Sequence, residues 1–482
     1  MQQLPNHKAK LVCTIGPVSN NPHTLEKMIL NGLNVARLNF AHGDFASHRK
    51  TIAAIRSAAR TVGKRVAILA DLPGPKIRLG KLKEEPVELG QGDTLVLTCR
   101  DTPIDSAHIP VQFPKLPEIV QPEQTIYLND GFIQLKVIEV TGKEVHCQAL
   151  VGGLLRSHKG LNVPGVDLGI SAFTDEDRRG LQFAVENGVD AVSQSFVQGP
   201  EDIAAVRAAA EEFGRVPCIF AKIERSLALK NYDAILQAAD GIMVARGDLG
   251  VEIPLQEIAI IQKRLIRKAN LRGKPVITAT QMLESMVTNR RPTRAEVTDV
   301  ANAILDGTDC VMLSEESATG AYPIDAVAML ASIAQATESE DSGEKVRETL
   351  TAALVQGTIN VEDLITQSVH QAVEHLPIVA VLTPTHSGTT ARRITRFRLP
   401  VWIVAMSTHE STCQALQFSY GVHPVYETDF QEHWENYARR WLNQQGITEG
   451  LAVLTQGPSN QHRSGTNDMR VIDLSQPTEN PL

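Results

Sequence analysis

Polar and charged residues stand two positions apart at the ends of several short apolar segments, a spacing that can build a reaction site. The pairs are Ser193 and Ser195, Lys222 and Glu224, Arg246 and Asp248, and Thr278 and Thr280. If these segments are β-strands, the two members of each pair lie on the same face of their strand. Burying so many charged groups costs free energy unless they pair with one another or bind a metal ion. We therefore expect the pairs to converge on one site.

The residue types at these positions favour phosphoryl chemistry. Glu224 and Asp248 provide carboxylate oxygens, which suit a hard, partly hydrated divalent cation, Mg²⁺ or Mn²⁺. Gly247 allows backbone N–H groups to approach a small carboxylate beside Asp248. Positive charge comes from Arg37, Lys76, Arg78, Lys159 and Lys222. A divalent cation among several cationic side chains is what transfer of a phosphoryl group between two anions needs.

Each motif also has a purely structural interpretation. A Lys-x-Glu pair is more often a structural ion pair, and a single Arg-Gly-Asp is more often a turn. Their joint occurrence at several strand ends favours a functional site. His42 could equally be a buried histidine of the core. The sequence has no GxxxxGK(S/T) loop and no protein-kinase motif set, which argues against those two classes of kinase.

Short apolar runs alternate with amphipathic segments, which is typical of a parallel sheet covered by helices. The expected strands are 11–16, 34–40, 65–72, 191–196, 217–224, 241–249, 275–281 and 310–316, and the helical patterns are 23–31, 45–62, 172–187, 200–213 and 255–270. Eight strands, each followed by a helix, predict a TIM (β/α)8 barrel formed by residues 1–72 and 160–337. An open doubly wound sheet is the alternative.

Residues 73–159 interrupt this alternation with period-two patterns and turn signals, as at 129–131 and 141–144. They predict an all-β lid domain inserted after the third strand, at the active-site end of the barrel. The acidic stretch 337–343 is typical of a linker. Alternation resumes in 343–482, which predicts a C-terminal α/β domain with strands at 378–382, 401–405 and 451–455.

The composition excludes several classes of protein. Hydrophobic residues make up 43% and charged residues 21%, which is ordinary globular usage. The net charge of −8 argues against a surface that coats nucleic acid. No apolar run approaches the roughly 20 residues that cross a bilayer, and the cysteines form no CxxC pair. The sequence starts with polar residues, so we expect no signal peptide there. We expect a cytoplasmic protein without nucleic-acid or membrane partners.

Ten segments, taken in order, resemble the pyruvate kinase family over essentially the whole chain. They are CTIGP at 13–17, ARLNFAHG at 36–43, DLPGPKIRLG at 71–80, NDG at 129–131, KGLNVPG at 159–165, AKIE at 221–224, MVARGDLGVEI at 243–253, ITATQMLESM at 277–286, PTRAEVTDVANAILDGTD at 292–309 and VMLSEESATGAYP at 311–323. Each segment is weak alone, but their order and spacing together are specific.

The resemblance implies the same three-part architecture, a homotetramer, and a glycolytic reaction that moves the phosphoryl group of phosphoenolpyruvate to ADP. By similarity, Glu224 and Asp248 hold the divalent cation. The remaining site residues follow in the same way: Gly247, Asp248 and Thr280 for the substrate carboxylate, Lys222 and Arg37 for the phosphoryl group and the enolate, and Asn39, His42, Arg78 and Lys159 for the nucleotide side. Thr280 and an ordered water are both candidates for the proton donor to the enolate.

The chain departs from the family where many members bind K⁺. Asn39 and Asp71 remain, but Ala41 and Leu72 replace two oxygen donors. Lys76 stands where potassium-requiring members carry glutamate, so its ammonium group can substitute for the charge of the ion. We therefore expect an enzyme that does not require K⁺.

A second departure concerns a loop that in the family binds a phosphate of an allosteric sugar effector. The matching residues are Ser387, Gly388, Thr389 and Thr390 at the start of a predicted helix, with Arg463 and Gly465 as further contributors. Hydroxyl and N–H groups there can form an anion nest. Two extra residues, 385–386, precede the motif, and an ordinary N-capped helix is the alternative.

Two other functions stay open at this point. One is another metal-dependent barrel that acts on pyruvate or phosphoenolpyruvate, such as an aldolase or lyase, which lacks the inserted lid. The other is an inactive paralogue that serves as an effector-binding or scaffold subunit. The intact Lys222 and Glu224 argue against the paralogue, whereas Ala41 and Asn129, the latter in place of an aspartate of the lid, leave it open.

Overall fold

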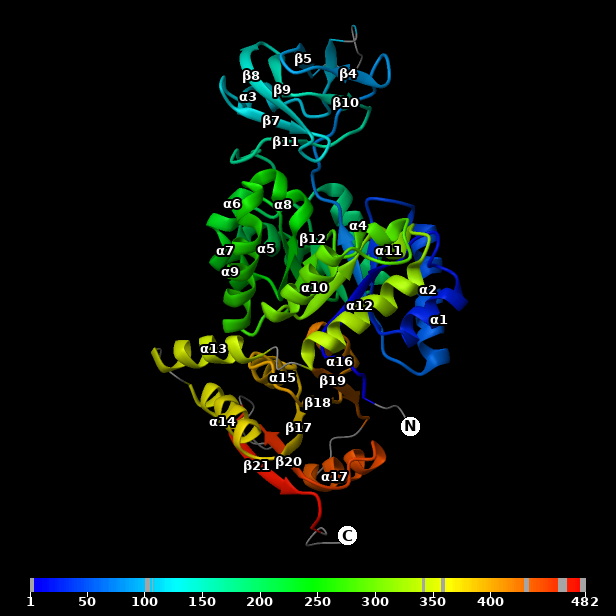
Figure 1. The fold of residues 1–482 in the computed structure, drawn as a ribbon, viewed down its shortest axis with the longest axis vertical. Coiled ribbons are helices and arrows are strands. Elements are labelled where there is room, and N and C mark those ends of the chain that lie inside the picture. The colour runs from blue at the N-terminus through cyan, green and yellow to red at the C-terminus, as the bar shows by residue number, and fades with distance from the viewer. Residues whose placement is uncertain are drawn as a thin grey trace.

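The computed structural model describes residues 4–99, 105, 107–339, 343–356, 360–428, 433–457 and 466–476. Figure 1 shows a β-domain at the top, a barrel in the middle and an α/β domain at the bottom. The barrel is a closed sheet of eight parallel strands in the order β1-β16-β15-β14-β13-β12-β3-β2. The prediction of a TIM barrel with an inserted β-domain and a C-terminal α/β domain is confirmed, and the open sheet is excluded.

The barrel strands lie close to the eight expected segments. They are β1 (Lys10–Thr14), β2 (Leu33–Asn39), β3 (Ala67–Leu72), β12 (Ala191–Gln194), β13 (Cys218–Ile223), β14 (Gly241–Ala245), β15 (Val276–Ala279) and β16 (Cys310–Leu313). The helices around them are α1 (Pro22–Leu30), α2 (Phe45–Val62), α4 (Asp175–Glu186), α5 (Pro200–Glu212), α6 (Ser226–Lys230), α7 (Tyr232–Ala238), α8 (Arg246–Glu252), α9 (Ile258–Leu271), α10 (Arg294–Leu305), α11 (Glu315–Ala318) and α12 (Pro323–Glu338), with 3₁₀ turns η1 (Leu255–Glu257) and η2 (Glu284–Val287).

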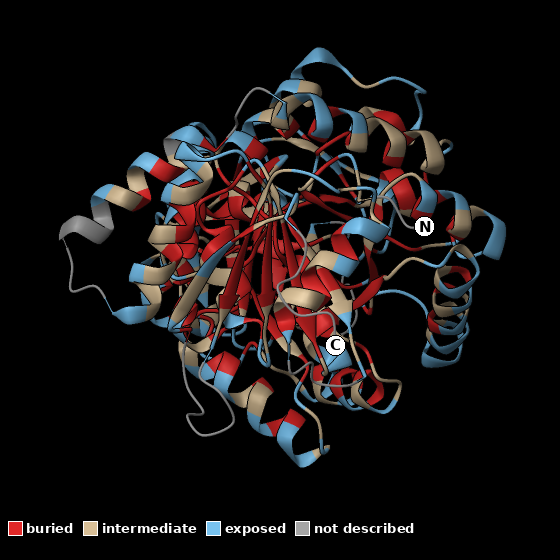
Figure 2. Ribbon diagram, turned by 90° about the horizontal axis from the view of Figure 1, so that it is seen from below, coloured by how far each residue is buried: buried red, intermediate tan, exposed pale blue. Residues whose placement is uncertain are grey.

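Burial explains why these strands have continuous apolar sequences. Every residue of β1, β3 and β14 is buried, because one face packs inside the barrel and the other beneath the helices. Figure 2 shows the buried strands at the centre and most exposed residues on the surrounding helices and loops. Side-chain caps fix where helices begin: Asp44 accepts a hydrogen bond from Ser47 N at the start of α2, and Thr174 does the same for α4.

The inserted and C-terminal domains have their own sheets. The lid contains β4 (Val87–Leu89), β5 (Thr94–Thr98), β6 (His108–Pro110), α3 (Leu116–Ile119), β7 (Thr125–Leu128), β8 (Ile133–Thr141), β9 (Glu144–Val151), β10 (Gly153–Leu155) and β11 (Leu161–Asn162). The C-terminal domain contains α13 (Glu344–Gln356), α14 (Val361–His375), β17 (Ile378–Pro384), α15 (Thr389–Thr395), β18 (Trp402–Ser407), α16 (Glu410–Ala415), η3 (Leu416–Phe418), β19 (Val422–Tyr426), α17 (Trp434–Gln444), β20 (Leu451–Gln456) and β21 (Asp468–Asp473), with the sheet order β19-β18-β17-β20-β21.

Several expected boundaries are wrong, including those of the sixth strand, the eighth strand and the linker. The sixth strand ends at Ala245, and the next residues form α8, because its partner β15 ends at Ala279, after which two residues adopt positive φ values and the ladder stops. The eighth strand ends at Leu313, and α11 takes up the rest of the expected segment. Of the expected linker 337–343, the first two residues belong to α12, and 340–342 lie outside the described residues.

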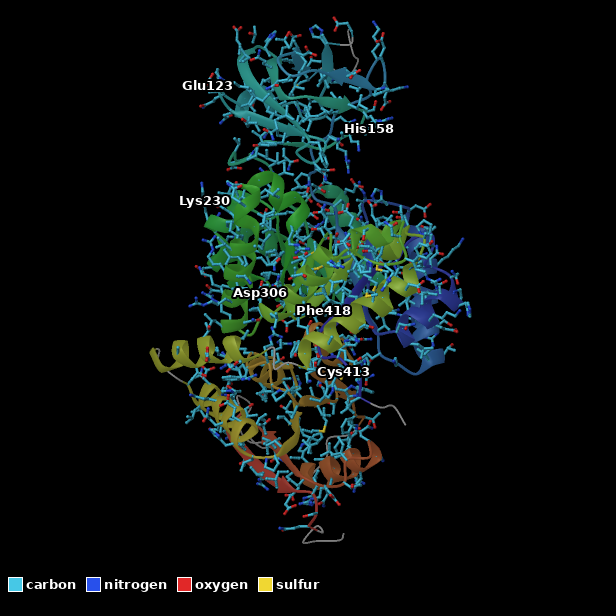
Figure 3. All side chains as sticks on the ribbon, viewed as in Figure 1. Glu123, His158, Lys230, Asp306, Cys413 and Phe418 are labelled. Atoms are coloured by element: carbon cyan, nitrogen blue, oxygen red, sulfur yellow. The ribbon has the colours of Figure 1, made fainter. Side chains whose placement is uncertain are left out.

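The two ends of the barrel are closed differently. At the N-terminal ends of the strands, Phe418 of η3 is fully buried and lies 4.8 Å, between ring centroids, from Phe220 of β13. Figure 3 shows Phe418 where the barrel meets the C-terminal domain. The lid faces the other end (Figure 1), so the carboxyl ends of the strands open toward it. None of the helices in the described ranges is long and apolar enough to span a bilayer.

Candidate active site

Asp71, near the end of β3, is the centre of a buried hydrogen-bond network at the mouth of the barrel. Its Oδ2 accepts hydrogen bonds from Arg37 Nη2 at 2.5 Å and Nε at 3.2 Å, and from Lys222 Nζ at 3.4 Å. Its Oδ1 accepts one from Ser193 Oγ at 2.6 Å. Lys222 Nζ also donates to Ser195 Oγ at 2.7 Å. Side chains from four adjacent barrel segments therefore meet around one carboxylate.

The charges in this network stabilise one another. Burial alone would raise the pKa of Asp71, but Lys222 and Arg37 outweigh it and hold that pKa below its ordinary value. Burial alone would lower the pKa of Lys222, but the carboxylates of Asp71 and Glu224 raise it above its ordinary value. Lys222 therefore stays protonated at neutral pH and is a fixed positive charge, not a base.

Glu224 directly follows β13, and its carboxylate is fully buried. Oε1 accepts a hydrogen bond from Phe196 N at 2.7 Å, whereas Oε2 has no hydrogen-bond partner in the described part of the chain and lies 3.5 Å from Lys222 Nζ. Burial raises the pKa of Glu224 to about 7; Lys222 opposes this rise and the Asp248 carboxylate adds to it. A buried carboxylate oxygen without a hydrogen bond, close to a second carboxylate, fits a divalent cation.

Thr280 and the start of α8 lie together beside these carboxylates. Gly247 N donates to Thr280 Oγ1 at 2.9 Å, and that hydroxyl donates to Ala279 O at 2.6 Å. Thr280 has a φ of 69°, a left-handed conformation that a threonine rarely adopts without support from its surroundings. Two hydrogen bonds thus fix the hydroxyl next to Asp248.

Arg246 supplies part of that support and does not reach the carboxylate pair. Its Nη2 donates to Thr280 O at 2.6 Å, and its Nη1 forms an ion pair with Asp299 at 2.7 Å. The expectation that Arg246 and Asp248 share one face of a strand is wrong, because both residues belong to α8. Arg246 anchors the turn after β15. Likewise, Thr278 is buried and donates to the Thr308 hydroxyl at 2.9 Å.

Lys76 connects the carboxylate site with the lid. Its Nζ lies 3.4 Å from Asp248 Oδ1 and 3.9 Å from Asp130 Oδ1 in the turn between β7 and β8. A Cβ atom placed on Gly131 of that turn would lie 3.6 Å from a methyl group of Val251 in α8. The lid turn therefore rests on the helix that carries Asp248, with Lys76 between them.

The residues expected on the nucleotide side lie around the lid junction and the β2 loop. Arg78 Nη1 donates to His158 O at 3.2 Å, next to Lys159, and Asn39 Oδ1 accepts from Ala41 N at 3.1 Å. Figure 3 places His158 in the lower half of the lid. His42 is exposed, so the alternative of a buried core histidine is wrong.

The effector-loop motif does begin a helix, α15. Gly388 has a φ of 79°, Gly388 N donates to Thr385 Oγ1 at 2.9 Å, and Ser387 and Thr389 hydroxyls are 2.9 Å apart. Thr390 Oγ1 hydrogen-bonds Thr466 Oγ1 at 2.5 Å. Arg463 and Gly465 lie outside the described residues.

Comparison with known proteins decides the family. A model of the pyruvate kinase barrel domain matches residues 6–327, and a model of the pyruvate kinase alpha/beta domain matches residues 363–472. This chain belongs to the pyruvate kinase family. Its reaction is the transfer of the phosphoryl group of phosphoenolpyruvate to ADP, which gives pyruvate and ATP. The aldolase or lyase alternative and the inactive-paralogue alternative are therefore wrong.

Relatives of the chain include pyruvate kinases from several organisms. The chain is 48% identical over 478 residues to a pyruvate kinase of Thermococcus litoralis, a match that covers 98% of this chain and 100% of that protein. It is 42% identical over 426 residues to pyruvate kinase 2 of Synechocystis, covering 88% and 71%. A crystal structure of a pyruvate kinase from Cryptosporidium parvum has a TM-score of 0.91 at 35% identity, with 97% and 96% of the chains covered.

The sequence alone left the role of Ser193 ambiguous, and the structure shows its partner. Its hydroxyl holds Asp71 Oδ1, so that Oδ2 is left to Arg37 and Lys222. We predict that Ser193→Ala lowers kcat by about tenfold, because Asp71 can then rotate and displace both cations. Steady-state kinetics test this, with Ser193→Thr expected to restore the rate. Equal loss in both variants, or no loss in either, would contradict the role.

Proposed function

We propose that Glu224 and Asp248 hold the divalent cation of the reaction, Mg²⁺ or Mn²⁺. The bound ion would offset charge on the phosphoryl group during its transfer. The observation that carries this proposal is the Oε2 atom of Glu224, which is buried and has no hydrogen-bond partner within the described ranges. The negative charge of Asp248 raises the pKa of Glu224, which supports the view that the two carboxylates lie close together.

Arg37 and Lys222 provide the remaining positive charge. Both are held in place by Asp71 before substrate arrives, so little reorganisation is needed as negative charge develops in the transition state. Thr280 and the N–H groups at the start of α8 bind the substrate carboxylate. The Thr280 hydroxyl is fixed by Gly247 and Ala279, so it can hold a proton at a defined position near the enolate.

Arg78 and Lys159 approach from the lid side, and with Asn39 and His42 they receive ADP. Arg78 forms an antiparallel β-bridge with Gly160, so the segment that carries Arg78 is paired with the segment next to Lys159. Pyruvate release that requires ADP, phosphoenolpyruvate and Mg²⁺ together tests the whole proposal. Release without added divalent cation, after treatment with a chelator, would contradict the metal role.

The enzyme works without K⁺ because Lys76 supplies a positive charge beside Asp248. Its Nζ lies 3.4 Å from Asp248 Oδ1. Asp71, at a position expected to bind K⁺, is already surrounded by Arg37, Lys222 and Ser193, and the fully buried Leu72 has no side-chain oxygen. A monovalent ion would have to displace these groups, which is unfavourable in a buried site.

We predict that KCl and tetramethylammonium chloride at equal ionic strength give the same rate with the unaltered enzyme. In Lys76→Glu, the lost ammonium group should lower the rate by about tenfold or more without K⁺, and KCl should restore part of the loss. Initial rates in both salts measure this. Strong activation of the unaltered enzyme by KCl alone would contradict the role of Lys76.

The C-terminal loop of Ser387, Gly388, Thr389 and Thr390 serves a phosphorylated sugar effector, supported by the hydroxyls that gather at the start of α15. The enzyme acts in the cytoplasm as a homotetramer, as its family membership suggests. Size-exclusion chromatography with light scattering tests the tetramer, and sugar phosphates in the rate assay test the effector.

A further inference from the structure

A large cavity lies between the barrel and the C-terminal domain, at the end of the barrel opposite the active site. Its volume is about 880 Å³, within the range of roughly 300–1,000 Å³ typical of small-molecule sites. One wall belongs to the barrel and contains residues of β1, the start of β2, and the last turn of α2 with the segment that follows it, within 59–66. The other wall belongs to the C-terminal domain and contains residues of α16, β19 and α17. Figure 1 shows α16 and β19 directly below the barrel.

The walls of this cavity are strongly positive. They carry six cationic side chains, Lys10, Arg56, Arg60, Lys64, Arg65 and Arg215, against the two carboxylates of Asp190 and Glu410. The chain as a whole has a net charge of −8. Positive charge in an otherwise acidic protein is therefore concentrated between two domains, where low-dielectric walls strengthen its field.

Half of these cations, and both acids, already have partners within the protein. Lys10 and Arg56 each donate to a backbone carbonyl oxygen at 2.7 Å, and Arg65 forms an ion pair with Glu410. Asp190 accepts a backbone N–H hydrogen bond at 2.8 Å. Asp190 also feels the charges of Arg56 and Arg215, so it offsets part of the positive charge on that side of the cavity. Two carboxylates against six cations still leave a positive excess.

The other three cations are Arg60, Lys64 and Arg215. Among the residues that the structure describes, none forms a hydrogen bond or ion pair with these three side chains. Burial lowers the pKa of Lys64, and burial together with Lys10 and Arg65 lowers the pKa of His423, another wall residue, to about 4. Burial likewise raises the pKa of Asp190 to about 6, so burial disfavours charge of either sign at this cavity. The excess of cationic side chains in its walls is what makes an anion the natural complement.

We propose that this cavity binds a phosphorylated small molecule with at least two negative charges. Guanidinium groups match phosphate oxygens in a bidentate fashion, and a lysine adds a point charge. Tyr426 and Trp441 line the same cavity and offer aromatic surface to the rest of the ligand. Because the walls belong to both domains, the bound molecule contacts the barrel and the C-terminal domain at once.

The proposed site is separate from the two sites described above. None of its lining residues belongs to the Ser387–Thr390 motif, to the carboxylate pair or to the network around Asp71. The barrel wall lies at the start of β3, whereas Asp71 lies near its end. Binding at the cavity therefore does not depend on the roles proposed for the active-site residues.

Calorimetric titration of the intact enzyme with glucose 1,6-bisphosphate, adenosine monophosphate and inorganic pyrophosphate tests the proposal and separates sugar from nucleotide ligands. In Arg60→Glu/Lys64→Glu, the Kd of the probe that binds should rise by about tenfold or more, since two positive charges become negative, a change of four units. The control Lys27→Glu/Lys50→Glu makes the same change of charge on exposed positions of α1 and α2 outside the cavity. A second control, Thr389→Ala/Thr390→Ala, removes the effector-loop hydroxyls.

Unchanged affinity in both controls, with weaker binding only in the cavity variant, supports the proposal. If no probe binds with a Kd below about 1 mM, or if affinity falls only in the loop variant, the proposal is wrong. The activity without added ligand checks that each variant is folded, because none of these residues belongs to the reaction site. If the cavity variant does not fold, the milder Lys64→Gln/Arg215→Gln replaces it with the same expected direction.

Discussion

Replacing Lys222 by methionine should lower kcat by about 10²–10³-fold and leave the fold intact. Lys222 is held by three partners before substrate arrives: Asp71, Ser195 and Glu224 lie 3.4, 2.7 and 3.5 Å from its Nζ. The pKa of Lys222 is raised above its ordinary value by Asp71 and Glu224, so the side chain carries this charge at neutral pH. Methionine fills a similar volume without the charge, so the substitution mainly removes electrostatic stabilisation of the transition state.

The fold should survive because Asp71 keeps its contacts with Arg37 and Ser193. Pyruvate formation under saturating substrates measures the loss, and circular dichroism and Mn²⁺ binding measured by electron paramagnetic resonance check fold and metal site. Lys230→Met, at an exposed lysine of α6, is the matched control and should retain the full rate. Near-normal ATP formation by Lys222→Met would remove Lys222 from the mechanism.

The convergence of the strand-end residues was predictable because it follows from two local rules. Residues two apart share a face, and the parallel strands of a closed barrel end on one side. Lys222, Glu224 and Ser195 meet near Asp71 for this reason. The segments that supply them are also continuous apolar runs, so their strand character is visible in the sequence itself.

The errors arise where a neighbouring segment decides the local conformation. Arg246 was expected on a strand, but β14 stops where β15 does, and β15 stops because Thr280 and the next residue take positive φ values. No local pattern around Arg246 carries that information. Ser193 was ambiguous because the role of a buried serine depends on its hydrogen-bond partner, here an aspartate 122 positions away in the sequence.

The interdomain cavity illustrates the same limit on a larger scale. Its cations come from separate segments, at Lys10, in and after α2, and at Arg215, and the opposite wall comes from residues beyond 409. A net charge of −8 describes the whole chain and does not indicate where a local cluster of positive side chains lies. The juxtaposition appears only once the C-terminal domain is packed beneath the barrel.

Replacing Glu224 by glutamine should weaken Mn²⁺ binding and lower kcat/KM, each by about 10²-fold or more, because one of two anionic ligands is lost. The amide keeps the size of the side chain, and its oxygen can still accept the hydrogen bond from Phe196 N. Burying an uncharged amide costs less than burying the carboxylate whose pKa is raised to about 7. The metal-free variant should therefore be at least as stable as the metal-free parent at pH 8.

Glu316 provides the matched control, since it is also a buried glutamate just beyond a barrel strand. Its two carboxylate oxygens are already occupied by backbone N–H groups, of Leu283 at 3.1 Å and of Ser314 at 2.7 Å. Glu316→Gln should therefore lower the melting temperature, because one of these hydrogen bonds loses its acceptor, and leave Mn²⁺ affinity unchanged. Electron paramagnetic resonance titration and thermal unfolding of both variants separate the two roles. If Glu224→Gln binds Mn²⁺ as tightly as the parent, the cation binds elsewhere and Glu224 Oε2 is not a metal ligand.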